Sequence, residues 1–335
     1  MGGKPVAFRR IPQCPATAPS RHESSRKLFV LSWHRARIEP GWVAMAPQGR
    51  RVHVVHVRCD AGQRPALRWA CTEAWDDAAQ ALRALRRSKP VQGQRTVAVL
   101  QHAQYQLLTL DAPELPRAEW RDAVRWRLKE LVEFPVDTAG IDVIDIPADP
   151  QQRRRAALMA VAAPRSELGP LAEAGHDAGL PWHAIDVQET ALRNIAVLGA
   201  EADRGQALLH VGQGYSTLVV VAVGELLVTR HIEVTLDQLT DADESARQSH
   251  YERASLELQR TLDNVERQFS HANLARLQVA PGLPLNGFIE YVRDLVYVPV
   301  TAFDLAAVLD LSAVPALLDP TEQAAYLPAI GAALR

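Results

Sequence analysis

The sequence predicts an α/β protein built from a duplicated unit. Residues 206–234 contain three apolar segments separated by two short glycine-bearing turns, which is the pattern of an antiparallel three-stranded meander. A second group of three strand-like segments, at 29–60, repeats this pattern near the start of the chain. Strands and helices alternate between and after the two groups, which favours α/β layers over a β-sandwich or a helix bundle.

Composition limits the class of protein further. The 335 residues, of which 47% are hydrophobic and 23% charged, are enough for about two domains or one large bilobed unit. A formal net charge of −2 gives no support for nucleic-acid binding by the body of the protein. Three cysteines without metal-ligand or redox spacing fit a reducing compartment. With no apolar run near the ~20 residues of a spanning helix and no signal peptide, we expect a cytoplasmic protein.

Residues 1–27 are expected to form a disordered basic arm. They carry six basic residues against one acidic residue, and four prolines make a helix unfavourable. Such an arm could touch anionic lipid headgroups, at about 1 kcal/mol for each charge near the surface. The alternative is a solvated tail, and we therefore expect membrane contact only through a partner or weakly through this arm.

The folded part is predicted to begin near residue 28 with the first meander. Its strands are expected at 29–38, 42–47 and 52–60, separated by turns that contain glycine. Residues 71–87 then repeat apolar side chains at helical spacing, and Lys89-Pro90 ends this helix.

The middle of the chain continues the alternation of strands and helices. A helix is predicted at 117–133, because Trp120, Val124, Leu128 and Leu131 share one face. The other elements predicted here are strands at 96–100, 105–110, 141–146, 156–163 and 182–185 and helices at 166–178 and 187–198.

The last third of the chain is expected to be mainly helical around a few further strands. Residues 321–334 predict a helix that is interrupted at Pro328, with Gly331 allowing close packing. The preceding elements are a helix at 245–269, a strand at 277–280, a turn at Pro281-Gly282, a helix at 284–295 and a strand at 298–302.

In these segments and their order the chain resembles the PilM-type proteins, which are actin-like proteins of type IV pilus assembly. Within this family the resemblance is greater to the divergent branch that includes MshI, a protein of MSHA-pilus biogenesis. The similarity runs from about residue 28 to 335 in the family's order of elements. Glu-Phe-Pro at 133–135 and Leu-Gln-Arg-Thr-Leu-Asp at 258–263 are the most telling motifs. The other matching segments are RDAVRWRLKELVEFPVD (121–137), VAAPRSEL (161–168), AIDVQETALRNIA (184–196), LELQRTLDNVERQ (256–268) and YLPAIGAAL (326–334).

The resemblance implies an actin/FtsA-like bilobed fold in which two RNase-H-like halves flank a nucleotide cleft. The first half is then expected at 28–94. A small extra subdomain, after which the chain returns to the first half, is expected at 95–185, and the second half at 186–335. The resemblance also implies a scaffold at the inner membrane that docks the N-terminal tail of a bitopic, PilN-like inner-membrane protein, in a groove between the first half and the extra subdomain.

The first phosphate hairpin of the expected cleft departs from the family pattern. Nucleotide-binding members look like Asp-x-Gly-Ser-x-Ser at this hairpin, whereas the region matched here contains Pro40-Gly41-Trp42. The serine donors are missing, and proline has no N–H to offer a phosphate. Glu39 is the only acidic residue nearby.

The second hairpin and the adenosine turn also depart from the pattern. His210 stands where the family has an acidic residue, although Mg²⁺ prefers oxygen ligands. The hairpin keeps Gly212, Gly214, Ser216 and Thr217, and two such glycines either cradle a phosphate or simply form a turn. The adenosine turn, Gly-Gly in the family, reads Ala280-Pro281-Gly282, so only Gly282 matches.

These departures favour a scaffold that has no cofactor, metal or catalytic residues. Such a protein would be a pseudo-ATPase, in which the nucleotide cleft is degenerate. The alternatives are an ATP- and Mg²⁺-binding or ATP-hydrolysing actin-like protein, a sugar kinase of the same superfold, and a nucleotide-sensing switch. For the partner groove the candidates are Trp126, Trp120 and Phe134. Trp120 lies on the apolar face and is equally consistent with core packing, whereas Trp126 lies off that face between arginines and is the better contact residue.

Overall fold

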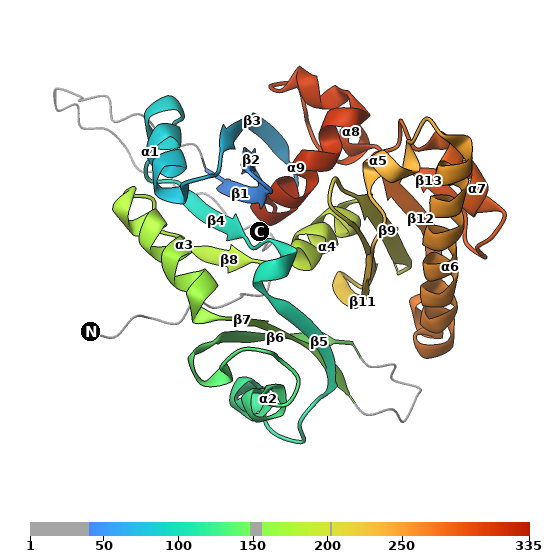
Figure 1. The fold of residues 1–335 in the computed structure, drawn as a ribbon, viewed down its shortest axis with the longest axis horizontal. Helices are drawn as coiled ribbons and strands as arrows, with labels where there is room; N and C mark the ends of the chain where they lie inside the picture. Colours follow the sequence, from blue (N-terminus) through green and yellow to red (C-terminus); the bar gives the residue numbers. More distant parts are fainter. Residues whose placement is uncertain (1–39, 148–155, 202) are drawn as a thin grey trace, which may run out of the picture.

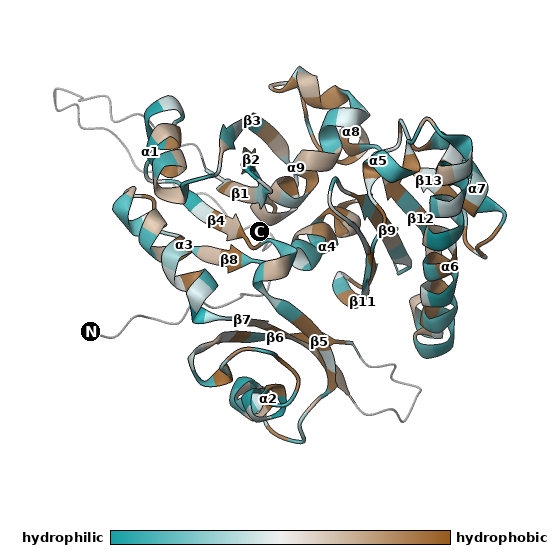
Figure 2. Ribbon diagram, in the orientation of Figure 1, coloured by the Kyte–Doolittle hydropathy of each residue, from teal (hydrophilic) through white to brown (hydrophobic). Residues whose placement is uncertain are grey.

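A computed structural model describes residues 40–147, 156–201 and 203–335 (Figure 1). The predicted arm at 1–27, the strand at 29–38 and Glu39 lie outside the described residues. Three sheets organise the described part, two with five strands and one with three. In Figure 2 most strands carry the brown of apolar residues, whereas the long helix at the edge of the molecule is mostly the teal of hydrophilic residues.

The first half is built on a five-stranded sheet in the order β3-β2-β1-β4-β8. Two antiparallel pairings join β1 to β2 and β2 to β3, and parallel pairings join β1 to β4 and β4 to β8. Helices α1 and α3 pack on one face, where Leu82 and Leu85 meet Val43 and Met45. The elements are β1 (Trp42–Gln48), β2 (Arg51–Arg58), β3 (Ala66–Ala74), α1 (Ala78–Ser88), β4 (Arg95–Val99), α3 (Arg165–Asp177) and β8 (Ala184–Asp186).

The second half repeats this arrangement strand for strand, with a sheet in the order β11-β10-β9-β12-β13. Its first three strands are antiparallel neighbours, and β12 and β13 continue the sheet in parallel. The duplicated α/β architecture predicted from the two meanders is therefore confirmed, but β3, the third strand of the first meander, lies in a segment for which the sequence predicted no strand. The elements are β9 (Gly205–Val211), β10 (Ser216–Ala222), β11 (Glu225–Ile232), α5 (Leu236–Leu239), α6 (Glu244–Gln268), β12 (Leu274–Ala280), α7 (Asn286–Arg293), β13 (Val300–Ala302) and α8 (Leu305–Val308).

A small subdomain is inserted between β4 and α3. It consists of a three-stranded sheet in the order β5-β7-β6 and of α2, which covers one face of that sheet. The bounds are β5 (Gln106–Asp111), α2 (Trp120–Leu128), β6 (Gly140–Ile146) and β7 (Ala157–Ala163). The subdomain occupies the middle of the range 95–185 that was expected for it and for the return to the first half; β4 before it and β8 after it belong to the first five-stranded sheet.

Two helices, α4 (Gln188–Leu198) and α9 (Pro320–Ala333), join the two halves. Helix α4 packs against the second sheet, α9 packs against β1 and β2 of the first sheet, and the two helices pack against each other. One buried cluster accordingly contains side chains from both halves, including Val55 and Val219. The expectation that 186–335 forms only the second half is therefore wrong, because the C-terminal helix packs on the first.

The contact between α4 and α9 depends on Gly331. A Cβ at this position would lie 2.6 Å from the carbonyl carbon of Ala191 and would also overlap its oxygen. The Asn194 side chain donates to the Gly331 carbonyl over 2.8 Å. The close packing expected at Gly331 is thus confirmed, but the interruption expected at Pro328 is not, because α9 continues through this proline.

One local prediction was wrong at the start of α1. The sequence predicts helix from residue 71, yet Cys71 belongs to β3, which pairs with β2 along its whole length. Pairing with a neighbouring strand outweighs the helix propensity of this alanine-containing segment. The helix begins after Asp77, whose carboxylate accepts from the Gln80 N–H over 3.0 Å.

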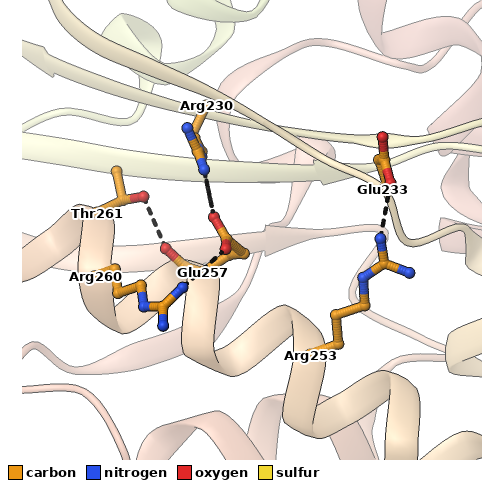
Figure 3. A network of polar contacts seen from close by, with 6 residues as sticks. All are labelled: Arg230, Glu233, Arg253, Glu257, Arg260 and Thr261. Carbon is orange, nitrogen blue, oxygen red and sulfur yellow. Dashed lines mark hydrogen bonds and ion pairs between the residues drawn. The ribbon is translucent and has the colours of Figure 1, made fainter.

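Ion pairs fasten α6 to β11 on the outer surface of the second half (Figure 3). Arg230 on β11 pairs with Glu257 at 2.7 Å, and Arg253 on α6 pairs with Glu233 at 2.8 Å. Arg260 reaches the same Glu257 at 3.5 Å. Exposed pairs of this kind are worth about 0–1 kcal/mol each, so they orient α6 while buried apolar side chains hold it in place.

Candidate functional site

A small cavity lies between the two halves. It encloses about 200 Å³, which is below the range of about 300–1,000 Å³ typical of small-molecule sites. Its walls come from the β1–β2 hairpin, the end of β4, the first residue of α4, the β9–β10 turn and α9. The side chains and turns most relevant to its chemistry are Pro47, Gly49, Gln101, Gln188, Gly214 and Tyr215.

The hairpin that the first half contributes is not the one expected from the sequence. Because the two sheets have the same strand order, the β1–β2 turn is the equivalent of the β9–β10 turn. That turn joins Gln48 to Arg51, whereas Trp42 begins β1 at its far end. The assignment to Pro40-Gly41-Trp42 is therefore wrong. The true hairpin places Gln48 and Gly49 on the cavity wall, and Gly49 has a φ of 58°, which favours glycine.

The β9–β10 turn is closed by its own backbone. The Gly212 N–H donates to the Tyr215 carbonyl over 3.0 Å, and the Gly212 carbonyl accepts from the Leu236 N–H over 2.8 Å. A side chain at Gly212 would lie 2.8 Å from the Tyr215 oxygen, so the close approach requires glycine there. Gly214 has open space around it. The turn therefore uses the N–H of Gly212 internally and does not offer it to a ligand.

His210 is fully buried and both of its ring nitrogens have partners. Nε2 lies 2.7 Å from the Ala324 carbonyl oxygen, and Nδ1 lies 3.3 Å from Nε2 of Gln188. Since a carbonyl only accepts, Nε2 carries the proton and Nδ1 accepts from the Gln188 amide. Burial lowers the pKa of His210, so the ring is neutral near pH 7.

The partner of His210 is a carbonyl that α9 leaves free. In a helix the Ala324 carbonyl would accept from the N–H of the residue four positions later, which is Pro328 and has none. The imidazole N–H of His210 takes the place of that missing donor. His210, which stands where the PilM-type proteins were expected to have an acidic residue, therefore serves as a hydrogen-bond donor that links β9 to α9.

Ser216, Thr217 and Gly282 do not line the cavity. The Ser216 hydroxyl donates to the Val234 carbonyl over 2.6 Å, and the Thr217 hydroxyl accepts from the Gln188 amide over 3.2 Å. Gly282 lies buried beside β13, where a Cβ would meet that of Ala302 at 2.8 Å. Of the cleft residues predicted from the sequence, the structure thus brings His210, Gly212 and Gly214 together at the cavity.

Four side chains that sequence reasoning missed close the space between the halves. Tyr215 donates its hydroxyl to Gln188 Oε1 over 2.7 Å. His102, which follows β4, stacks on His231 of β11 with ring centroids 4.1 Å apart and planes at 8°. Tyr215 packs against both histidines, with centroids at 5.1 and 4.6 Å. Burial lowers the pKa of both histidines and raises that of Tyr215, so the cluster is uncharged at neutral pH.

Two buried acidic side chains, Glu189 on α4 and Asp186 at the end of β8, have internal partners. Tyr105 donates to Glu189 over 2.6 Å, and burial raises the pKa of Glu189. Asp186 accepts from the Val187 N–H over 2.9 Å and pairs with Arg335 at 2.5 Å. Within the described ranges there is no group of three side chains suited to hold a metal ion.

The three aromatic residues predicted for a partner groove have different surroundings. Trp120 and Phe134 are half-buried and pack on the core of the small subdomain, and Trp120 donates its indole N–H to the Leu115 carbonyl over 2.9 Å. Trp126 projects from α2 with 71% of its surface exposed. The Lys129 ammonium lies 4.3 Å from the centre of its ring. Of the three, Trp126 is therefore the one available to a partner without rearrangement of the core. Because α2 lies on the side of the small subdomain away from both large sheets (Figure 1), Trp126 does not lie in a groove between the first half and the subdomain, contrary to the expectation from the sequence.

A titratable contact between α9 and the first sheet gives an expected pH dependence. Nδ1 of His53 is hydrogen-bonded to the Thr72 hydroxyl over 3.0 Å. The His53 ring packs on the ring of Tyr326 of α9, with ring centroids 4.8 Å apart. Burial, and then the charge of Arg51, lower the pKa of His53 to about 4. The unfolded chain takes up this proton near pH 6.5. We expect full stability above pH 6.5 and a loss of up to about 3 kcal/mol as the pH falls towards 4.

Urea unfolding at pH 7.5, 5.5 and 4.5 measures this effect. The variant H53Q keeps a polar side chain that does not titrate, and its unfolding free energy should fall less steeply with pH. An unchanged pH dependence in H53Q would assign the effect to other groups.

The two similar halves, their matching sheets and the central helix pair define an actin-like, bilobed fold. Among solved structures, a chain of a "PilM-PilN type IV pilus biogenesis complex" is similar with a TM-score of 0.69 and 19% identity, over 89% of this chain and 98% of that one. At this identity the likeness concerns the fold.

Two further solved structures align less closely. The cytoplasmic domain of EpsL, an inner-membrane component of the type II secretion system of Vibrio cholerae, has a TM-score of 0.44 at 10% identity, over 71% of this chain and 81% of that one. A Bacteroides thetaiotaomicron protein with an actin-like ATPase fold has a TM-score of 0.46 at 8% identity, over 84% of this chain and 96% of that one. No protein-family model matches the chain, and no curated protein matches its sequence.

Proposed function

We propose that this protein is a non-enzymatic scaffold of type IV pilus assembly, of the MSHA type. In this role it docks the N-terminal tail of a PilN-like, bitopic inner-membrane protein and works on the cytoplasmic face of that membrane. The likeness to a chain of a PilM–PilN complex motivates the assignment. Among the described residues no helix is both long and apolar enough to cross a membrane, and attachment through a partner agrees with that finding.

The observation that carries the proposal is that the cleft is filled by the protein's own neutral side chains. Tyr215, bonded to Gln188 and packed on the two stacked histidines, occupies the space between the halves. The remaining cavity of about 200 Å³ is smaller than most small-molecule sites, and among the described residues no acidic side chain lines its wall to hold Mg²⁺.

A calorimetric titration with Mg-ATP tests the cleft. We expect no measurable binding to the wild-type protein at millimolar nucleotide. The variant Y215A, which enlarges the cavity, should not bind either, because the missing carboxylates are not restored. Micromolar binding to the wild type would instead favour the ATP-binding alternative. Binding to Y215A alone would mean that the tyrosine blocks an otherwise competent site.

Partner capture is tested through Trp126. We expect W126A to weaken binding of a synthetic peptide from the N-terminus of a PilN-like protein about tenfold or more, because exposed tryptophans often dominate small interfaces. Fluorescence anisotropy measures the affinity, and a melting curve should show an unchanged fold.

The matched control for W126A is L256A. Leu256 is a 45% exposed apolar residue on α6 of the second half, far along the chain from the subdomain. Its replacement should leave peptide binding unchanged. Equal affinity of the wild type and W126A would exclude α2 as the docking surface.

A further inference from the structure

The outer side of α2 presents a tryptophan among carboxylates. Val124 and Leu128 of this helix are buried, so residues two positions away point outward. Glu119, Asp122, Trp126 and Glu130 follow one another on that side at spacings of three and four residues, and all four are exposed. We call these four residues the outer α2 surface. In Figure 1, α2 lies at the end of the small subdomain, away from both large sheets.

The arginine side chains of the same segment have partners within the subdomain itself. Arg117 pairs with Asp145, and Arg121 pairs with Asp142 at 2.9 Å. Arg125 donates to the Val136 carbonyl over 2.5 Å, and Arg127 donates to the Asp111 carbonyl over 2.6 Å. The fifth basic residue, Lys129, pairs with Asp137 at 3.1 Å. The arginines therefore fasten α2 to its sheet and to the turn at 136–139, while Lys129 contacts both that turn and the Trp126 ring.

Two carboxylates of the outer α2 surface stand apart from these ion pairs. In the part of the chain that the structure describes, neither Asp122 nor Glu130 forms an ion pair, although they stand one turn before and one turn after Trp126. The Trp126 ring already accepts an ammonium group, because Lys129 Nζ lies 4.3 Å from its centre. An indole face and two flanking carboxylates are together complementary to a cationic chain.

We infer that the outer α2 surface binds a basic segment of the partner, the Lys- and Arg-bearing residues that lie next to its membrane span. This inference rests on the proposed docking function and adds the chemistry of the partner. Segments that flank a spanning helix on the cytoplasmic side are enriched in Lys and Arg, so the tail of a bitopic partner carries cations close to its docking residues. A cation over the exposed Trp126 ring and a contact to each carboxylate would each contribute modestly, and together they account for a several-fold change in affinity.

The test uses the full-length chain and two fluorescent peptides in an anisotropy titration. One peptide contains the N-terminal tail of a PilN-like protein together with the Lys and Arg residues next to its span, and in the other those residues are replaced by Gln. We expect the basic peptide to bind D122N/E130Q about fivefold more weakly than the wild type, and more so at low salt. The neutral peptide should bind both proteins with the same, weaker affinity.

The matched control removes two exposed carboxylates elsewhere. The variant D237N/E252Q changes the net charge by the same amount but alters α5 and α6 of the second half. It should bind the basic peptide like the wild type. A loss equal to that of D122N/E130Q would assign the effect to net charge and overturn the inference.

The remaining outcomes separate the inference from the proposed function. If W126A loses the peptide while D122N/E130Q keeps it at all salt concentrations, docking at α2 stands and its basic specificity is wrong. If wild type binds neither peptide, the proposed docking function itself fails.

Discussion

Replacing Gly331 by alanine is expected to cost more than about 3 kcal/mol of unfolding free energy, and G331V is expected to yield no soluble protein. The added Cβ of alanine would lie 2.6 Å from the carbonyl carbon of Ala191, so α4 and α9 would have to separate. Overpacking usually costs about 1–3 kcal/mol, and more where the clash is with backbone that cannot rotate away. The cost should be large here because this helix pair joins the two halves.

Gly169 provides the comparison, because it also lies within a helix, α3, and no atom beyond its chain neighbours is within 4 Å of an added Cβ. Alanine is the better helix former, but Pro170 follows and disfavours the helical conformation of a residue with a Cβ, so G169A should change the unfolding free energy by no more than about 1 kcal/mol. Thermal and urea unfolding of both variants measure the difference. A G331A protein as stable as G169A would show that the two helices do not pack as closely as described.

The second large effect is expected at the pair formed by His210 and Pro328. H210F keeps an aromatic ring in the core but removes the donor to the Ala324 carbonyl and the acceptor for Gln188. A buried polar group without a partner costs about 1–3 kcal/mol. H210F leaves the Ala324 carbonyl without its partner, whereas the Gln188 amide keeps its bond to Thr217, so we expect a loss of about 1–3 kcal/mol. The variant should remain folded if the total stability is ordinary for its size.

A double-mutant cycle with P328A isolates the role of the missing helix donor. In H210F/P328A the alanine introduced in place of the proline has a backbone N–H that can donate to the Ala324 carbonyl, so part of the loss should be recovered. We expect a coupling free energy of about 1–2 kcal/mol between the two sites. Strict additivity of the two substitutions would mean that His210 and Pro328 act independently.

Hydrophobic periodicity was sufficient to predict the layered α/β class and its duplication, because strand and helix patterns depend on neighbours within a few residues. The same local signal failed at residues 71–74, where pairing with β2 makes a strand from a segment with helical spacing. It also failed at Pro328. There the side chain of His210, 114 positions before Ala324 in the chain, makes the bond to the Ala324 carbonyl that the proline cannot make.

The candidate site was predicted only in part, and the reason lies in its hydrogen bonds. The glycines of the β9–β10 turn could be recognised, since a tight turn is a local feature. The partners of His210, Ser216 and Thr217 could not, because each is supplied by another element. The closing cluster likewise combines His102 from the first half with Tyr215 and His231 from the second.

The spacing of apolar side chains was enough to locate most of the strands and helices, to show that the unit occurs twice, and to identify the side of α2 on which Val124 and Leu128 are buried. The side chains that fill the space between the halves could be identified only from the folded chain. There, polar atoms from distant segments pair with one another and an unpaired buried group would be costly, so their final partners depend on which elements meet.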